Sequence, residues 1–310
     1  MTRLCFVAIL ASATTLTHVT AAPPPCDTTF DQDSPSDPFW KTLANWDPRV
    51  PGPDDVACIT NNNAAVIAYD VPHVAKAIYI EEGSSALIYN LDSLKLCTGT
   101  EDCIASQIDG ELVIYGVADD NTDPVSNLFL GDDVTVEGTG IIELENWSGP
   151  AVIAGESGVS LTIAGSITLL GTDGGEDVEN GDVRVPLINN GTVIASEGIL
   201  RIQEGGSGTG TWAAESDTGV LVIENEITGS GTWELTDHED ATIRFDADSR
   251  CLTGDVEIRK GTLHANQTRV ITTGDLVMAP PGEITLTGTG TGASSAARVR
   301  FSGVKPGVCP

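Results

Sequence analysis

The sequence predicts an all-β protein, a parallel β-helix (β-solenoid) with coils of about 20–22 residues and an N-terminal cap. The composition is the first reason, because 34 glycines with only 5% aromatic residues disfavour long helices. The second reason is the alternation of apolar and polar residues that marks short strands, seen in segments 112–115, 134–136, 161–163, 221–223 and 284–286. The third is an internal repeat.

The repeat aligns segment 198–212 with segment 219–233, without a gap. The matched pairs are Leu200 with Leu221, Ile202 with Ile223, Gly208 with Gly229, Gly210 with Gly231 and Trp212 with Trp233. A repeat of this length, made of short strands and glycine turns, is typical of one β-helix coil, in which like residues stack over like. A β-sandwich, which also has regular short strands, is the alternative.

The two repeated tryptophans, Trp212 and Trp233, would lie one coil apart. They could form an exposed aromatic ladder for sugar stacking or pack inside the coil. Burial is favoured, because large aromatic side chains are highly buried on average.

The N-terminal segment 1–22 has the pattern of a secretory signal. A single positive charge at Arg3 precedes an apolar run over 4–10, and small residues lead to Ala21 and Ala22, where cleavage is expected. The run is too short to cross a bilayer core of about 30 Å, which needs about 20 apolar residues. The sequence therefore predicts a secreted or cell-surface protein without membrane insertion.

The rest of the chain divides into three parts. Segment 23–55 is rich in Pro and Asp, contains Trp40 and Trp46, and is expected to cap the open end of the solenoid. Segment 56–304 is the expected solenoid domain, and segment 305–310 is a C-terminal tail.

Six cysteines remain after the signal: Cys26, Cys58, Cys97, Cys103, Cys251 and Cys309. An even number in an exported chain indicates disulfides. We prefer Cys26–Cys58, Cys97–Cys103 and Cys251–Cys309, although the sequence alone leaves the other pairings open. Metal binding by these cysteines is disfavoured, because the chain has no C-x-x-C motif and only 4 histidines.

The charge balance limits the partners. With 45 acidic and 15 basic residues, the net charge is −30, which repels nucleic acid and anionic membranes. The expected partners are extracellular glycans, surface proteins, or further copies of this chain joined end to end.

Residues 39–57 carry a resemblance to a known class. They read Phe-Trp-Lys-Thr-Leu-Ala-Asn-Trp-Asp-Pro-Arg-Val-Pro-Gly-Pro-Asp-Asp-Val-Ala. This segment resembles the Trp…Asn-Trp…Val-Pro-Gly…Asp opening of large bacterial surface proteins and autotransporter-like adhesins, which leads into a parallel β-solenoid. The resemblance covers roughly residues 39–90 and implies a fold and an extracellular location. It implies no reaction, because a fold does not determine an activity.

One polar cluster could support catalysis. Arg244 and Asp246 are followed, one expected coil later, by His264 and Asn266, so regular coils would stack Arg244 on His264. These two residues and Asp246 are the candidate catalytic groups of a polysaccharide lyase or glycoside hydrolase. Arg259 and Lys260 would complete a basic and acidic groove. A solvated face is the simpler interpretation, so catalysis is not the leading prediction.

Calcium is the one cofactor that the sequence suggests. Asp119, Asn121 and Asp123 place oxygens at alternate positions of an acidic segment, which suits this hard cation. The segment is no EF-hand, because Pro124 and Leu130 stand where that motif needs Gly and Glu. A surface turn is the alternative.

Three sites match the N-glycosylation sequon and would matter in a eukaryotic source: Asn146, Asn190 and Asn266.

The leading functional prediction is a secreted or cell-surface structural or adhesion protein that is not an enzyme. It would act as a rigid acidic rod that presents its faces to glycans or protein partners. The alternatives are an extracellular polysaccharide lyase or glycoside hydrolase of β-helix type, and a subunit of an extracellular filament or appendage.

Overall fold

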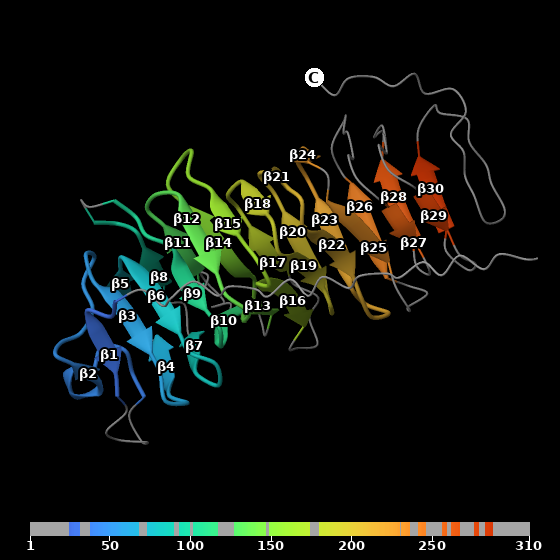
Figure 1. The fold of residues 1–310 in the computed structure, drawn as a ribbon. Helices are drawn as coiled ribbons and strands as arrows, with labels where there is room; N and C mark the ends of the chain where they lie inside the picture. Colours follow the sequence, from blue (N-terminus) through green and yellow to red (C-terminus); the bar gives the residue numbers. More distant parts are fainter. Residues whose placement is uncertain are drawn as a thin grey trace, which may run out of the picture.

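The structure is a computed structural model, in which the chain forms an elongated stack of short strands (Figure 1). It describes residues 25–31, 38–67, 73–89, 93–99, 102–116, 127–146, 149–173, 180–229, 231–235 and 241–245, and the backbone of 256–258, 262–266, 276–278 and 283–287. The predicted signal, the C-terminal tail, Cys251 and Cys309 lie outside the described residues.

The described strands form three sheets of ten strands each, which we name sheets A, B and C. In spatial order, sheet A contains β2 (Trp46–Asp47), β1 (Thr28–Phe30), β3 (Val56–Ile59), β6 (Ala77–Ile80), β9 (Ser106–Ile108), β12 (Val134–Glu137), β15 (Leu161–Ile163), β18 (Leu187–Asn189), β21 (Gly206–Gly208) and β24 (Ile227–Gly229). Sheet B contains β4 (Ala64–Ile67), β7 (Ser85–Ile88), β10 (Glu111–Gly116), β13 (Ile141–Asn146), β16 (Thr168–Asp173), β19 (Thr192–Ala195), β22 (Thr211–Ala214), β25 (Thr232–Leu235), β27 (Val256–Ile258) and β29 (Leu276–Met278). Sheet C contains β5 (His73–Ala75), β8 (Ser93–Leu96), β11 (Asn127–Leu130), β14 (Ala151–Gly155), β17 (Asn180–Val183), β20 (Ile199–Ile202), β23 (Val220–Ile223), β26 (Thr242–Phe245), β28 (Thr262–Asn266) and β30 (Glu283–Thr287).

The chain visits sheets A, B and C in turn, so one strand from each sheet makes one coil. Within each sheet every described pair of solenoid strands is parallel, as in β20 with β23 and β22 with β25. The only antiparallel pair among the described strands is β1 with β2 in the cap. This topology confirms the parallel β-helix and excludes the β-sandwich, which is built from antiparallel sheets.

The strand register confirms the internal repeat. Leu200 pairs with Leu221, Gly208 with Gly229, and Trp212 with Trp233, as the aligned segments predicted. The predicted coil length is correct only for part of the rod. Nearer the N-terminal end of the rod Leu94 pairs with Leu128, a much longer coil, because extra residues are inserted in the connections between strands. Surface connections accept such insertions at small cost in loop entropy.

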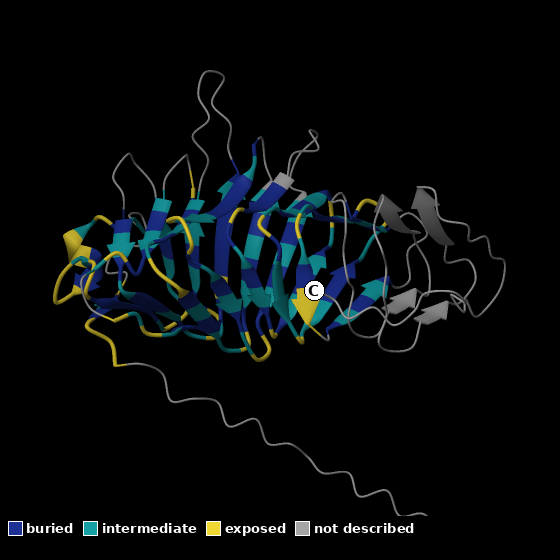
Figure 2. Cartoon of the chain, turned by 90° about the horizontal axis from the view of Figure 1, so that it is seen from above, coloured by how far each residue is buried: buried dark blue, intermediate teal, exposed yellow. Residues whose placement is uncertain are grey.

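The core is a set of inward columns of apolar side chains, and most strands alternate buried and partly exposed residues along their length (Figure 2). Trp212 and Trp233 lie in one such column. Both are buried, and their rings stack with centroids 5.4 Å apart and planes 12° apart. The prediction that these tryptophans are buried is therefore confirmed.

The N-terminal cap packs on the first coil through three aromatic side chains. Phe30, Trp40 and Trp46 are buried, and Trp46 Nε1 donates a hydrogen bond of 2.6 Å to the carbonyl oxygen of Trp40. Strand β1 extends sheet A, and Pro38 and Trp40 exchange backbone hydrogen bonds with Val66 at the edge of sheet B. The short 3₁₀ helix η1 (Leu43–Asn45) joins these segments. The cap therefore covers strand edges that would otherwise be open.

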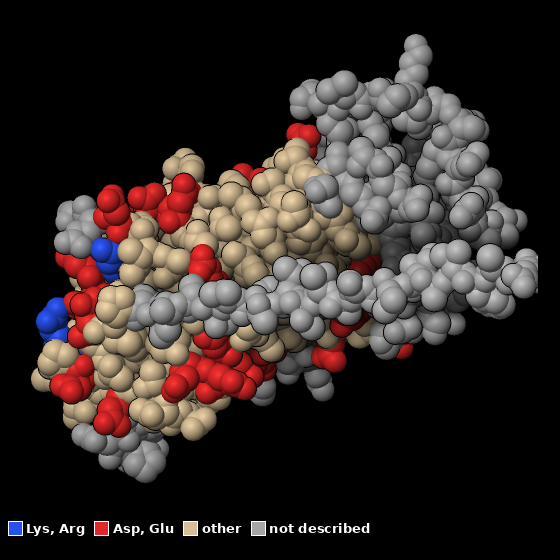
Figure 3. All heavy atoms as spheres, viewed as in Figure 1, with Lys and Arg blue, Asp and Glu red and all other residues tan. Residues whose placement is uncertain are grey.

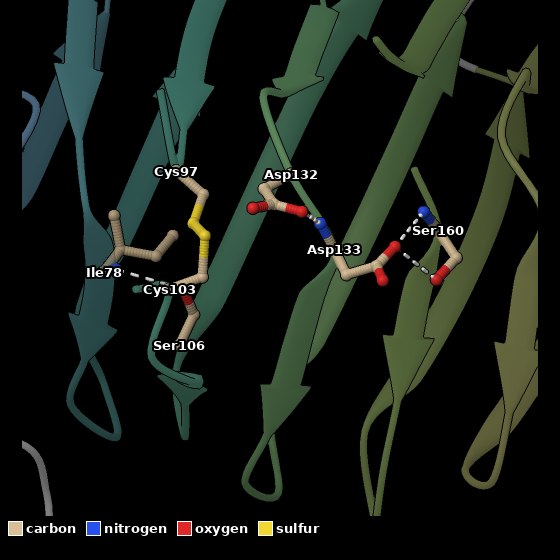
Figure 4. Close-up of a disulfide and its surroundings, with 7 residues drawn as sticks. All are labelled: Ile78, Cys97, Cys103, Ser106, Asp132, Asp133 and Ser160. Atoms are coloured by element: carbon tan, nitrogen blue, oxygen red, sulfur yellow. Dashed lines mark hydrogen bonds between the residues drawn. A yellow bond between two sulfur atoms is a disulfide. The ribbon is translucent and has the colours of Figure 1, made fainter. Parts of the chain in front are cut away.

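Two of the three preferred disulfides are present. Cys26–Cys58 joins the cap to β3, with Cα atoms 5.7 Å apart. Cys97–Cys103 closes a short loop between β8 and β9 (Figure 4).

Candidate functional site

The outer faces of sheets A and B carry columns of hydroxyl side chains. On sheet B the strand register places four threonines in one line: Thr168, Thr192, Thr211 and Thr232. On sheet A the corresponding line contains Thr135, Thr162, Ser207 and Thr228, and it is interrupted by Ile188 between Thr162 and Ser207. Successive coils are about 4.8 Å apart, so sheet B presents hydroxyl groups at a regular spacing, and sheet A does so on either side of Ile188.

The outer face of sheet C carries most of the described cations. Lys95, Arg184, Arg201 and Arg244 lie on or directly after its strands, whereas no described strand of sheets A or B contains Lys or Arg. Several of these cations contact neighbouring groups. Arg184 Nη2 lies 2.8 Å from Asp182 Oδ2, Arg201 Nη1 lies 3.0 Å from Glu224 Oε1, and the Lys95 ammonium lies 5.1 Å from the centre of the Phe129 ring.

The structure brings part of the predicted catalytic cluster together. Arg244 on β26 and His264 on β28 are paired in register, as their spacing predicted, and Arg244 is half-buried on the outer face. Asp246, Arg259 and Lys260 lie outside the described residues, as does the side chain of His264. The shared register of Arg244 and His264 is thus confirmed, and their catalytic role stays a prediction.

The remaining predicted sites are only partly described. The calcium candidates Asp119, Asn121 and Asp123 lie outside the described residues. Of the three sequons, only Asn190 has a described side chain, which is exposed just after β18 and accepts hydrogen bonds of 3.3 Å from the backbone and hydroxyl of Thr209. The side chains of Asn146 and Asn266 are not described.

A further group of side chains lies on the outer face of sheet B, and sequence reasoning missed it. We name it the tyrosine–glutamate cluster, and it contains Tyr89, Tyr115, Glu143, Glu145 and Thr172. Tyr89 directly follows β7, while the register aligns Tyr115 on β10, Glu145 on β13 and Thr172 on β16. Figure 3 shows carboxylates gathered in the region of β10 and β13.

Specific contacts order this cluster. The rings of Tyr89 and Tyr115 meet edge to face, with centroids 5.7 Å apart. Thr172 Oγ1 donates a hydrogen bond of 2.8 Å to Glu143 Oε1, and the Tyr115 hydroxyl is hydrogen-bonded to Glu145. Both carboxylates are thus held by a hydroxyl donor.

The cluster perturbs the ionisation of its own members. Partial burial raises the pKa of the Tyr115 hydroxyl, and the neighbouring carboxylates Glu145, Glu143 and Glu111 raise it further. Partial burial also raises the pKa of Glu145, with a second contribution from Glu143, and the Tyr115 hydrogen bond opposes both. Both shifts disfavour the charged form.

Two other kinds of site are absent from the described residues. In that part of the chain, no three His, Cys, Asp or Glu side chains are grouped so that they could hold a metal ion. The same residues include no helix with the length and apolar character needed to cross a membrane.

Comparison with known proteins found no significant similarity: no protein-family model matches the chain, and neither does any curated protein or solved structure.

Proposed function

We propose that this chain is a non-catalytic extracellular rod that serves in adhesion or in surface or matrix structure, through contacts of its outer faces with glycans or surface proteins. The main support is the register of eight coils that have a strand in each sheet, from β3–β5 to β24–β26. This register keeps the apolar columns inside the rod and repeats hydroxyl groups along the outer faces of sheets A and B. A regular polar face suits a repetitive partner such as a polysaccharide.

Two further features support the proposal. The disulfides Cys26–Cys58 and Cys97–Cys103 suit an oxidising, extracellular compartment. Arg184 and Arg201 form ion pairs with carboxylates on or directly after strands of the same sheet, so both cations are already paired within the rod.

The test measures binding and cleavage in parallel. The purified mature chain is passed over immobilised neutral and acidic polysaccharides and surface proteins, and binding is followed by biolayer interferometry. The same polysaccharides are incubated with the chain, with and without calcium, and assayed for new reducing ends and for ultraviolet absorbance of unsaturated products. Binding without products is expected. Product release by the folded chain would contradict the non-catalytic assignment.

The second candidate function is cleavage of an acidic polysaccharide on the outer face of sheet C. The pairing of Arg244 with His264 on adjacent strands favours it, because a lyase needs a base beside a cation that neutralises the uronate. If cleavage is observed, Arg244→Ala and His264→Ala should abolish it. Lys95→Ala, on the same sheet but several coils away, should leave it unchanged.

A further inference from the structure

We infer that the tyrosine–glutamate cluster is a binding subsite for a neutral sugar unit. The inference rests on the proposed function, since it locates the glycan contact on the outer face of sheet B. The subsite combines an exposed aromatic ring with two fixed carboxylates, a combination in which the ring covers the apolar side of a sugar and the carboxylates accept its hydroxyl protons.

The aromatic half of the subsite is Tyr89. Tyr89 is 46% exposed, and no other aromatic residue in the described part of the chain is exposed to a similar degree. Its ring lies against Tyr115, which restricts how it can turn. A rigid, amphipathic ring at the surface offers apolar contact area at low entropic cost to a ligand that is apolar on one side and polar on the other.

The polar half is the pair Glu143 and Glu145, which occupy alternate positions of β13 and therefore lie on the same face of the sheet. Each carboxylate accepts one hydrogen bond from within the cluster, from Thr172 or from Tyr115. A carboxylate has about four acceptor positions, so both keep capacity for the hydroxyl groups of a sugar. The internal hydrogen bonds hold them in position before a ligand arrives, which lowers the ordering cost of binding.

The negative charge on the outer face of sheet B limits the class of sugar that can bind there. Glu111, Glu143 and Glu145 lie on two adjacent strands, and no described strand of sheet B carries Lys or Arg. A uronate or sulfated sugar would meet uncompensated negative charge here. Neutral hexoses and N-acetylhexosamines have only hydroxyl and amide groups to present, so they are the chemical class that the face admits.

Partial burial strengthens the polar contacts. Tyr115 and Glu145 are both partly buried, so water is already partly excluded from the cluster. Hydrogen bonds formed where water is scarce are stronger than those at a fully hydrated surface.

The chain offers a matched control in Tyr79. It also faces outward, on sheet A, and its pKa is raised by partial burial and by two nearby carboxylates, Glu81 and Asp109. It lies on a different face of the rod from the cluster. Tyr79→Phe therefore removes a hydroxyl from a similar local environment without touching the subsite.

The experiment measures the Kd of neutral hexasaccharides of glucose, N-acetylglucosamine and mannose, with hexagalacturonate as the acidic counterpart. The wild-type chain is compared with Tyr89→Ala, Tyr115→Phe, Glu145→Gln and Tyr79→Phe, each checked by circular dichroism and thermal unfolding. We expect Tyr89→Ala to raise the Kd of a neutral hexasaccharide about tenfold, a loss typical of one aromatic contact. Tyr115→Phe and Glu145→Gln should raise it severalfold, Tyr79→Phe should not change it, and hexagalacturonate should not bind. Tyr115→Phe keeps the packing of the ring, so it tests the subsite even if Tyr89→Ala disturbs the fold.

The outcomes separate the subsite from the function on which it rests. Neutral sugar binding that survives all three cluster variants would overturn the subsite and leave the proposed function standing. A preference for hexagalacturonate, or binding that is lost with EDTA, would overturn the neutral-sugar assignment. Binding to surface proteins without any glycan would overturn the subsite alone, and no binding to either class would overturn both.

Discussion

The coils between β6 and β17 differ from those between β18 and β26 in the length of the connections between their strands, although both groups share the same three-sheet topology and the same kind of core. In the first group coil length varies, and Leu94 pairs with Leu128, which lies 34 residues farther along the chain. In the second group Leu187 pairs with Gly206 and Leu200 with Leu221, so coil length stays nearly constant. Both groups nevertheless stack apolar side chains in register. The core therefore determines the register, whereas the connections are free to vary and to bring new side chains to the surface.

The largest effect is expected from the regular coils, where packing depends on a stacked aromatic pair. Trp212→Ala should lower the free energy of unfolding by about 3–5 kcal/mol, because it removes a large buried side chain and leaves a cavity against Trp233. Tyr89→Ala, a surface change in the irregular coils, should cost less than about 1 kcal/mol. Urea denaturation followed by circular dichroism measures both, and equal losses would contradict the contrast.

The two disulfides should contribute unequally. Replacing Cys26 and Cys58 by Ser should destabilise the chain by about 4 kcal/mol, and replacing Cys97 and Cys103 by about 2 kcal/mol, because the loops they close span 32 and 6 residues. Thermal unfolding of the two double variants under non-reducing conditions tests the order. A larger loss for the Cys97–Cys103 variant would show that loop entropy does not set the order.

Glycine substitutions should distinguish the closely stacked strands of the regular coils from the open turns of the irregular ones. A Cβ at Gly208, where φ is +132°, would clash with the carbonyl oxygen of Asn189 in the coil before it. Gly158 also has a positive φ, of +89°, but a Cβ there would meet nothing within 4 Å. We expect Gly208→Ala to cost about 2–3 kcal/mol and Gly158→Ala about 1 kcal/mol. Denaturation midpoints should show this difference, and similar midpoints would mean that the coils can separate locally.

The smallest effect concerns pH. The pKa of Glu145 is raised above its ordinary value of 4.5, so folding favours its protonated form. Its contribution to stability is full below the unfolded value and is lost as pH rises through the raised folded value. Glu145→Gln removes this contribution. The Tm of the variant relative to that of the wild type should therefore increase as pH rises above about 4.5. Glu156→Gln, at an exposed turn, should follow the wild type, and an identical pH profile for both variants would contradict the effect of burial.

The same contrast explains what the sequence could predict. The constant offset of the regular coils revealed Leu200, Leu221, Trp212 and Trp233 as repeat positions, and the structure pairs them. The alternation of apolar residues over 112–115 marked a strand, and β10 contains it. Local periodicity needs no knowledge of distant residues, so it is readable in either group of coils.

The tyrosine–glutamate cluster could not be predicted in this way. Tyr89, Tyr115 and Glu145 lie on successive coils of unequal length, because inserted connections separate their strands. No fixed period aligns them, and only the strand register shows that they are neighbours. The link between Arg244 and His264 was predictable because their offset is that of an uninterrupted coil.

The paired tryptophans also allow the unfolding of the rod to be followed by near-ultraviolet spectroscopy. Trp212 and Trp233 are nearly parallel, whereas Trp40 and Trp46 in the cap meet at 64° with centroids 4.6 Å apart. Indole rings this close couple their electronic transitions, and the sign and size of the resulting near-ultraviolet signal depend on their mutual angle. The two pairs should therefore give different optical signatures. Because each coil contacts chiefly its neighbours, the order in which the two signals vanish on heating would tell from which part of the rod melting begins.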